Sequence, residues 1–322
     1  MRIAAVQFEG VPGDVAENLG RLGPLVAEAV DTGAEVIALP EFCTSPVVFR
    51  PEVHRAVLPP ENTALEMLRD VAQRHGVMIG GSLLVADGDE VYNRYHLVEP
   101  DGAVHTHDKD LPTMWENAFY GPGRDDGVVS TGTAAGRVGL AVCWELIRNR
   151  TARRMLGRVD LVLSGTHWWT VPTNWGPVDR VLGGVAQYNR YLSENAPAEL
   201  ARRLGVPVVQ ASHCGEFTTG FGLVPGVRVA PPYRTHFVGA TQIVDADGRV
   251  LAWRSTEDGP GVVVADVEVG ARAPRQPIAR RFWTPDLPWA IRAYWWQQNA
   301  FARRYYRARG RAAGLAAAAR ES

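Results

Sequence analysis

The chain has 322 residues, of which 46% are hydrophobic and 21% are charged, and its formal net charge is −1. This composition is typical of a globular protein and allows one large domain or two. A net charge so close to zero argues against nucleic acid or a membrane surface as the main partner. No apolar run approaches the ~20 residues that a membrane span requires.

The cysteines are an odd number, Cys43, Cys143 and Cys214, and show no CxxC spacing. A disulfide framework or a zinc cluster is therefore not expected, and the usage fits a reducing compartment. The stretch from Met1 to Gln7 has the pattern of a strand, and no apolar segment typical of a signal peptide follows it. We therefore expect a soluble, cytoplasmic protein.

The first part of the chain alternates apolar runs with amphipathic segments. Asp14 and Thr63 are each followed three residues later by glutamate, a capping-box pattern that predicts the start of a helix. The two helices are expected to end at Gly33 and Gly76. Buried strands are expected at residues 3–6, 36–39, 77–79, 83–85 and 92–98.

The alternation continues to about residue 270. Helices are expected at residues 151–156 and 176–204, the second with a break near Pro197. The Gly- and Pro-rich segment 217–235 shows no clear period and is expected to be a loop. Strands are expected at residues 138–142, 160–163, 206–210 and 262–269, and a hairpin at 237–253.

This order of elements predicts a layered α/β domain, a mixed sheet covered by helices. No linker-like boundary precedes residue 270, so residues 1–270 are assigned to one domain. Residues 271–322 form an extension rich in arginine, tryptophan and tyrosine that ends in an Ala-rich helix. We expect it to be mainly helical and to pack on the domain or on a neighbouring subunit, because aromatic residues are enriched in buried contacts of both kinds. Binding of acidic ligands is the alternative.

Three chemically distinct side chains fall where an expected strand meets a loop. Cys143 ends the apolar run 138–142, Glu41 directly follows the strand 36–39, and Lys109 leads into a loop. Singly, each has an ordinary explanation: a buried structural thiol, a salt-bridge partner, a solvated charge. Together they supply a nucleophile, a base and a cation for a developing oxyanion, which is what covalent acyl transfer requires.

The segments that carry these residues resemble the three signatures of the nitrilase superfamily of carbon–nitrogen hydrolases. They read Leu39-Pro-Glu41-Phe42, Lys109 and Ala141-Val-Cys143-Trp144-Glu145, and residues 1–270 follow the family pattern in order. The resemblance implies a four-layer αββα fold, two sheets packed face to face with helices outside, and a homodimer or larger homo-oligomer. It also implies Glu41 as general base, Lys109 as oxyanion stabiliser and Cys143 as nucleophile, with no metal or organic cofactor.

Further site residues follow from the same resemblance and from position. The run from Lys109 to Glu116 resembles the Pro-Thr-x-x-Glu segment of nitrilase-type members, so Glu116 is expected to join the catalytic set; a surface glutamate is the alternative. A Cys–His dyad is a second possibility, because two histidines also end strands. Ordinary packing is the alternative for the residues that we expect to bind the substrate, Trp115, Trp144, His167, Trp168, Trp169 and His213.

The resemblance implies a small-molecule amide or nitrile as substrate, but the branch is left open. Trp144-Glu145 favours nitrilase-type members, whereas Leu146-Ile-Arg-Asn149 and Ser212-His-Cys-Gly215 depart from the nitrilase and amidase patterns respectively. We favour an amidase, since amide hydrolysis is the commoner activity across the superfamily. A nitrilase, an acyltransferase with the same three residues and an inactive scaffold are the alternatives. Nearby aromatic residues favour a hydrophobic or aromatic acyl group.

Overall fold

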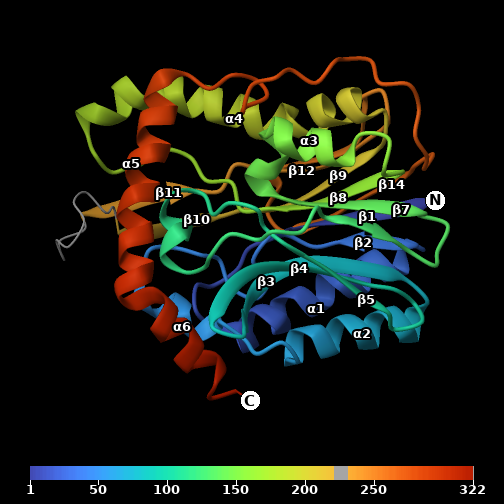
Figure 1. Ribbon diagram of the computed structural model, residues 1–322, viewed down its shortest axis with the longest axis horizontal. Coiled ribbons are helices and arrows are strands. Elements are labelled where there is room, and N and C mark those ends of the chain that lie inside the picture. Colours follow the sequence, from blue (N-terminus) through green and yellow to red (C-terminus); the bar gives the residue numbers. More distant parts are fainter. Residues whose placement is uncertain (221–230, 322) are drawn as a thin grey trace.

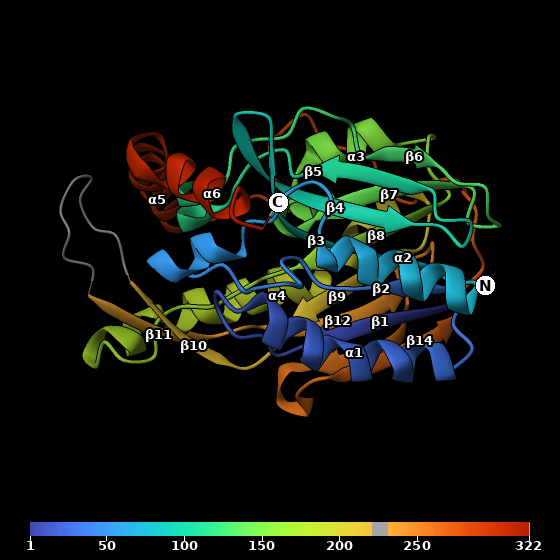
Figure 2. The same ribbon diagram turned by 90° about the horizontal axis from the view of Figure 1, so that it is seen from below.

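The computed structural model describes residues 1–220 and 231–321, without the side chains of residues 177–181. Helices form both outer layers and strands lie between them (Figure 1). One outer face carries α1 (Val15–Asp31) and α2 (Thr63–His75), which lie side by side in Figure 2. The opposite face carries α3 (Asn149–Met155) and α4 (Pro177–Leu204). The predicted α/β fold, a mixed sheet with flanking helices, is confirmed.

Twelve strands belong to one hydrogen-bonded network among the described residues. One part runs β14-β1-β2-β3-β4-β5 and the other β6-β7-β8-β9-β12-β13. The parts meet where the end of β1 pairs with β9 through Gln7↔Ser212 and Phe8↔His213, so the two expected sheets are joined at this point. The strands are β1 (Arg2–Phe8), β2 (Val36–Ala38), β3 (Met78–Asp87), β4 (Glu90–Val98), β5 (Val104–Asp108), β6 (Val128–Ser130), β7 (Arg137–Val142), β8 (Leu161–Thr166), β9 (Val208–His213), β12 (Gly239–Val244), β13 (Val250–Ser255) and β14 (Gly261–Asp266).

The strand β1 is buried on both faces, which is why its sequence is a continuous apolar run. Ile3 and Ala5 belong to the larger hydrophobic core, whereas Ala4 and Val6 pack in the core that also contains Leu22 of α1. Side chains of a strand alternate between its faces, so consecutive residues enter different cores. The sheet therefore has apolar packing on both sides.

The helix caps agree only in part with the capping-box prediction. The Asp14 carboxylate accepts a hydrogen bond from Glu17 N, as predicted for the start of α1. The cap of α2 is Asn62 and not Thr63: Asn62 Oδ1 accepts from Leu65 N at 3.0 Å, and Thr63 is already helical. Both residues suit the N-cap position, and asparagine precedes threonine in the chain and in preference.

The predicted break in α4 near Pro197 is wrong, because the helix continues from residue 177 to 204. A proline within a helix leaves the carbonyl four residues earlier without its usual donor. That carbonyl is Ser193 O, which accepts from Gln210 Nε2 of β9 at 3.4 Å. The next carbonyl, Glu194 O, accepts from Gln242 Nε2 of β12 at 2.8 Å. Gln210 thus supplies a donor to the carbonyl that Pro197 leaves without one, and Gln242 ties the same turn of α4 to β12.

The expected loop 217–235 is also partly wrong. Its ends form an antiparallel pair, β10 (Glu216–Gly220) and β11 (Pro232–His236), with Phe217 opposite Thr235. The middle of the predicted loop, residues 221–230, lies outside the described residues. The Gly- and Pro-rich centre of this segment masks the strand pattern of the short flanking sequences, so the sequence predicts a loop.

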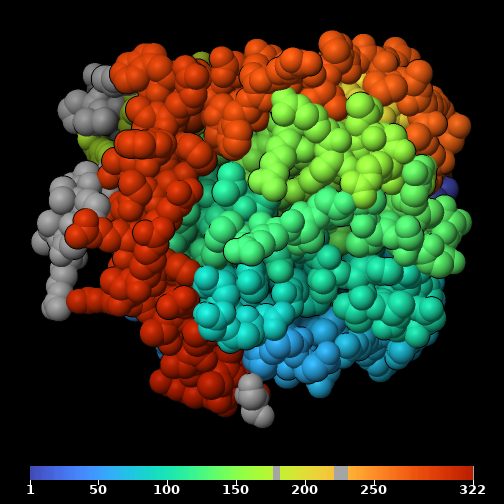
Figure 3. All heavy atoms as spheres, viewed as in Figure 1, coloured from blue at the N-terminus to red at the C-terminus, as the bar shows by residue number. Residues whose placement is uncertain are grey.

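The helices of the C-terminal extension pack against earlier parts of the same chain. The helix α5 (Trp289–Tyr305) continues through a π-helical turn (Tyr306–Gly310) into α6 (Arg311–Ala318). In Figures 1 and 3 this red segment crosses one end of the molecule, from the α4 layer toward the α1–α2 side. Within the described part of the chain, no helix is long and apolar enough to cross a membrane.

Candidate active site

Cys143 stands at the turn between β7 and a short 3-10 helix, η3 (Cys143–Ile147). Its φ of 54° lies in the left-handed region, which is unfavourable for a residue with a side chain. Turns of this kind at the carboxyl end of a strand project a nucleophile away from the backbone. The side chain is buried, with only 1% of the residue exposed.

A glycine on the neighbouring strand brings Glu41 toward this turn. Gly165 of β8 pairs with Val142, the residue before Cys143. A Cβ at Gly165 would lie 2.4 Å from Glu41 N, so a larger residue would push the Glu41 backbone away. The absence of a side chain at this position therefore allows Glu41 and Cys143 to occupy one site.

Lys109 is the only lysine of the chain, in which every other of the 34 basic residues is arginine. Its backbone is fixed on both sides, with Lys109 N donating to Asn93 O at 2.9 Å and Gly123 N donating to Lys109 O at 2.7 Å. Its Nζ donates to Glu41 Oε1 at 2.7 Å and to Glu116 Oε2 at 2.6 Å. All three side chains are fully buried. The predicted carboxylates and the ammonium thus meet as one cluster.

Two further residues hold the carboxylates and were not predicted. Asn93 Nδ2 donates to Glu41 Oε1 at 2.8 Å, and the Tyr120 hydroxyl donates to Glu116 Oε2. Glu116 also accepts from Thr113 N at 3.0 Å, within the 3-10 turn η2 (Met114–Ala118). Tyr120 follows Glu116 by four residues, a spacing that could have indicated the contact. Asn93 lies in β4, whose backbone pairs with Lys109 N, and this pairing brings its side chain to Glu41.

Burial and charge set the protonation of the cluster. Burial raises the pKa of Glu41 to about 7, although the Lys109 ammonium acts to lower it. Burial alone would lower the pKa of Lys109, but Glu116 and Glu41 together raise it well above its ordinary value. Burial and the charge of Glu41 raise the pKa of Cys143. The resting site therefore holds an ammonium, a neutral thiol and a carboxyl group that titrates near neutrality, which suits a general base.

Glu41 keeps one oxygen for the thiol. Its Oε1 accepts from Lys109 and Asn93, whereas Oε2 has no hydrogen-bond partner among the described residues. The Cys143 thiol beside it acts to lower the pKa of this carboxyl group. The backbone N–H of His167 faces the sulfur and lowers the pKa of Cys143, against the larger effect of burial. This arrangement provides an acceptor for the thiol proton.

The carboxylate of Glu145 fixes the backbone beside both Cys143 and Lys109. Glu145 Oε2 accepts from Val142 N at 2.7 Å, and Oε1 accepts from Asp110 N at 3.1 Å. His107 Nε2 lies 2.9 Å from Oε2, and Arg154 Nη2 donates to Oε1 at 2.9 Å. Within the described residues, no group of three or more His, Cys, Asp or Glu side chains is placed to hold a metal ion.

The two histidines at strand ends are bonded to backbone atoms and not to the thiol. His167 Nε2 accepts from Val47 N at 3.1 Å, and His213 Nε2 donates to Glu41 O at 2.6 Å. Their Nδ1 atoms have no hydrogen-bond partner in the described structure. Burial lowers the pKa of His213 to about 4 and that of His167 well below its ordinary value. The Cys–His dyad considered from the sequence is therefore not formed in this structure.

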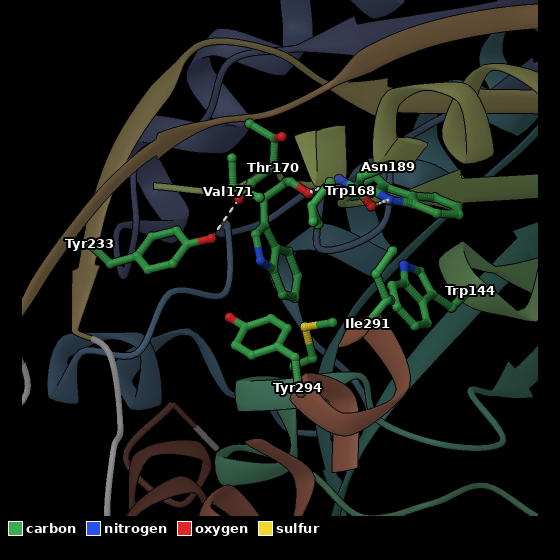
Figure 4. A pocket seen from close by; sticks show the side chains of 11 residues that line it. Trp144, Trp168, Thr170, Val171, Asn189, Tyr233, Ile291 and Tyr294 are labelled. Carbon is green, nitrogen blue, oxygen red and sulfur yellow. Dashed lines mark hydrogen bonds between the residues drawn. The ribbon is translucent and has the colours of Figure 1, made fainter. Parts of the chain in front are cut away.

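Figure 4 shows an aromatic cavity whose lining includes sequence neighbours of the cluster but not Glu41, Lys109, Glu116 or Cys143 themselves. Its walls include Trp144, which follows Cys143, Trp168, which follows His167, and Met114 of η2. Trp115 stacks on Trp169 with ring centroids 4.0 Å apart, and His167 meets Trp169 edge-on at 5.7 Å. Trp115, His167 and His213 are buried and do not line the cavity. Of the six predicted substrate-binding residues, Trp144, Trp168 and Trp169 line this cavity. The others that line it are Met114, Thr170, Val171, Val185, Asn189, Tyr233, Ile291 and Tyr294.

Residues 2–276 match the model of a protein family described as carbon–nitrogen hydrolase. The chain belongs to the carbon–nitrogen hydrolase family. This confirms the resemblance drawn from the segments around Glu41, Lys109 and Cys143, and it makes the chain an enzyme that acts on non-peptide carbon–nitrogen bonds.

Curated relatives of this carbon–nitrogen hydrolase include amidases and a nitrilase. An omega-amidase NIT2 of Danio rerio is 31% identical over 61% of this chain and 74% of that protein. The omega-amidase NIT2 of Xenopus tropicalis is 33% identical over 45% of this chain, and the match spans about half (55%) of that relative's length. An aliphatic nitrilase of Rhodococcus rhodochrous is 23% identical over 84% of this chain and 75% of that protein.

Solved structures share the fold. The amidase NitN of Nesterenkonia sp. AN1 superposes with a TM-score of 0.61 and 23% sequence identity, over 83% of this chain and 93% of that protein. A carbon–nitrogen hydrolase of Helicobacter pylori gives a TM-score of 0.61 at 17% identity, over 83% of this chain and 88% of the other. At these identities the likeness supports the architecture of this carbon–nitrogen hydrolase and nothing finer.

Proposed function

We propose that this enzyme hydrolyses a small amide whose acyl group is uncharged, through a thioester on Cys143. The observation that carries the proposal is the cluster in which Lys109 Nζ contacts both Glu41 and Glu116 while Glu41 Oε2 is left for the thiol. A base, a cation and a sulfur nucleophile are the groups that amide cleavage needs.

In the first half-reaction Glu41 removes the proton of Cys143 as the sulfur attacks the amide carbonyl carbon. The oxyanion is stabilised by Lys109 Nζ and by the backbone N–H of Trp144, in the first turn of η3, where no intrahelical acceptor is available. When the carbon–nitrogen bond breaks, Glu41 gives its proton to the leaving amine. The products are a free amine or ammonia and the acyl thioester of Cys143.

In the second half-reaction water replaces the amine. Glu41 takes a proton from the water as the water oxygen attacks the thioester carbonyl, and Lys109 again stabilises the oxyanion. The carbon–sulfur bond breaks, the thiolate regains the proton from Glu41, and the carboxylic acid leaves. Glu116 keeps Lys109 in place through its 2.6 Å ion pair, and Tyr120 and Thr113 hold Glu116.

The cavity supports a neutral acyl group. Its lining among the described residues contains aromatic, aliphatic and uncharged polar side chains and no ionisable Asp, Glu, Lys, Arg or His. The amide of Asn189 is already used, accepting from Trp168 Nε1 at 2.8 Å and donating to Trp169 O at 2.7 Å. A charged substrate, such as one with a free primary amine, would lose its hydration there without a partner. Apolar and aromatic acyl groups would gain from burial.

A nitrile remains the second candidate, because an aliphatic nitrilase is among the relatives and Trp144-Glu145 favours that branch. Attack of Cys143 on a nitrile carbon would give a thioimidate in place of the tetrahedral amide adduct.

We also propose a cytoplasmic homo-oligomer. The three cysteines are free thiols, which supports a reducing compartment. Light scattering of the purified protein tests the oligomer.

The test is ammonia release from matched amides and nitriles by the wild type, Lys109→Ala and Lys109→Arg. Loss of one oxyanion donor costs about 10²–10³ in kcat, so Lys109→Ala should lose most turnover. Lys109→Arg keeps the charge, but its larger guanidinium does not fit between Glu41 and Glu116, and it should not restore the rate. Near wild-type turnover by Lys109→Ala on a good substrate, with unchanged circular dichroism, would refute the role of Lys109.

A further inference from the structure

The extension that follows the family-matched region is tied to the turn that carries Cys143. Thr284 N donates to Ile147 O at 2.7 Å, at the end of η3. Asn149 Nδ2 donates to Arg281 O at 2.9 Å and to Trp283 O at 3.2 Å. These bonds lie within a few residues of the sulfur in sequence, so residues 281–284 are anchored beside the site.

The helix α5 is tied to the turn that carries Glu116. Asn299 Oδ1 accepts from Met114 N and from Asn117 Nδ2, both at 2.8 Å. Arg303 Nε donates to Asn117 Oδ1 at 3.0 Å. Asn299 is almost fully buried, with 3% of the residue exposed. The extension is therefore hydrogen-bonded to η2 as well as to the end of η3.

The same helix closes the aromatic cavity. Ile291 and Tyr294 of α5 both line the cavity, and Ile291 lies beside Trp144 in Figure 4. Only 6% of Ile291 is exposed, and its side chain has no polar atom to orient a ligand. Ile291 therefore affects the cavity through the size and shape of its side chain.

We infer that Ile291 of α5, from outside the region that matches the family, sets the size of the acyl group that the aromatic cavity accepts. The inference rests on the proposed function, because it places the acyl group of the amide in this cavity. Two tryptophans of the lining have partners within the chain: Trp168 Nε1 donates to Asn189 Oδ1, and Trp169 stacks on Trp115 and accepts at its backbone carbonyl from Asn189 Nδ2. The wall from α5 is an aliphatic side chain, which substitution can shorten or enlarge without leaving a polar group unpaired.

The experiment compares kcat/KM for butyramide and 3-phenylpropanamide in the wild type, Ile291→Ala and Ile291→Phe. Discrimination by a single methylene group in an apolar pocket amounts to about 10- to 200-fold. Ile291→Ala should therefore raise the ratio of the larger to the smaller substrate by about 10-fold, and Ile291→Phe should lower it by a similar factor. The matched control is Leu287→Ala, a buried aliphatic residue of the same extension that does not line the cavity.

Leu287→Ala should lower the melting temperature without changing the ratio, which separates loss of stability from change of shape. An unchanged ratio in both Ile291 variants of an active enzyme would overturn the inference. The affinities of Cys143→Ala and Cys143→Ala/Ile291→Ala for the same two amides, measured by calorimetry, keep the test independent of turnover. A changed order of affinities without any wild-type turnover would support the cavity and refute the proposed amidase.

Discussion

At the scale of single residues, burial and neighbouring charges have opposite effects on the pKa values of the site. The cluster of Glu41, Lys109 and Glu116 places one cation between two carboxylates with no exposed surface. One positive charge cannot offset the burial of two negative charges, so one carboxyl group takes up a proton readily. That group is Glu41, whose pKa is raised to about 7. The same imbalance that costs stability supplies a base near neutral pH.

We expect Glu41→Gln to be inactive and more stable than the wild type at pH 8. Because the pKa of Glu41 is higher in the folded protein than its ordinary value of 4.5, folding favours the protonated form. The stabilisation from this group is present below about pH 4.5 and is lost as the pH rises through about 7. Glutamine mimics the protonated form at every pH. The variant should gain about 1–3 kcal/mol in urea unfolding at pH 8.

The control is the same pair of proteins at pH 4.5, where both carry a neutral side chain and should unfold at similar urea concentrations. The wild-type kcat should rise between about pH 6 and 8, as Glu41 ionises. A Glu41→Gln protein that is less stable than the wild type at pH 8 would show that Glu41 is mainly a structural ion-pair partner.

At the scale of elements, the site depends on how β5 and the loop after it are joined to β7. Glu145 accepts the backbone N–H before Cys143 and the one after Lys109. His107, at the end of β5, lies between Glu145 and Asp125. Burial would lower the pKa of His107, but Glu145 and Asp125 raise it to about 9. A charged histidine thus links the end of β5, next to Lys109, to η3, which begins at Cys143.

His107→Gln should destabilise the protein by about 3 kcal/mol at neutral pH and much less at pH 10. The folded-state pKa of His107 lies above its ordinary 6.5, so its stabilisation is complete below about pH 6.5 and is lost as the pH rises through about 9. Urea unfolding of both proteins at pH 6.5 and pH 10 measures the difference. The groups that face the ring are Glu145, Asp125 and Arg154. An equal difference at the two pH values would mean that His107 acts by packing alone.

At the scale of the whole molecule, the layered fold and the meeting of three distant residues were predictable from the sequence. The strands that end at Ala38 and at Val142 are continuous apolar runs, a pattern that predicts a buried strand from the sequence alone. The lone lysine is a further signal: a chain that otherwise uses arginine keeps lysine where only a compact ammonium fits between Glu41 and Glu116.

What the sequence could not predict depends on contacts between distant segments. The continuity of α4 through Pro197 requires Gln210 of another element, and the N-cap of α2 had two adjacent suitable residues. The aromatic residues 168 and 169 predicted a cavity, but no periodicity in the tail indicated that Ile291 would close it. Local sequence patterns predict the helices and strands. The exact helix ends, the continuity of α4 and the lining of the cavity depend on side-chain contacts between distant segments.

The most direct measurement of the central claim is intact-protein mass spectrometry of the enzyme quenched during turnover of a slowly hydrolysed aryl amide. The account predicts an adduct with the mass of the acyl group, located on Cys143 by peptide mapping, sensitive to hydroxylamine and absent from Cys143→Ser. Hydrolysis of the amide at the wild-type rate by Cys143→Ala, with no acyl adduct on the wild type, would contradict it.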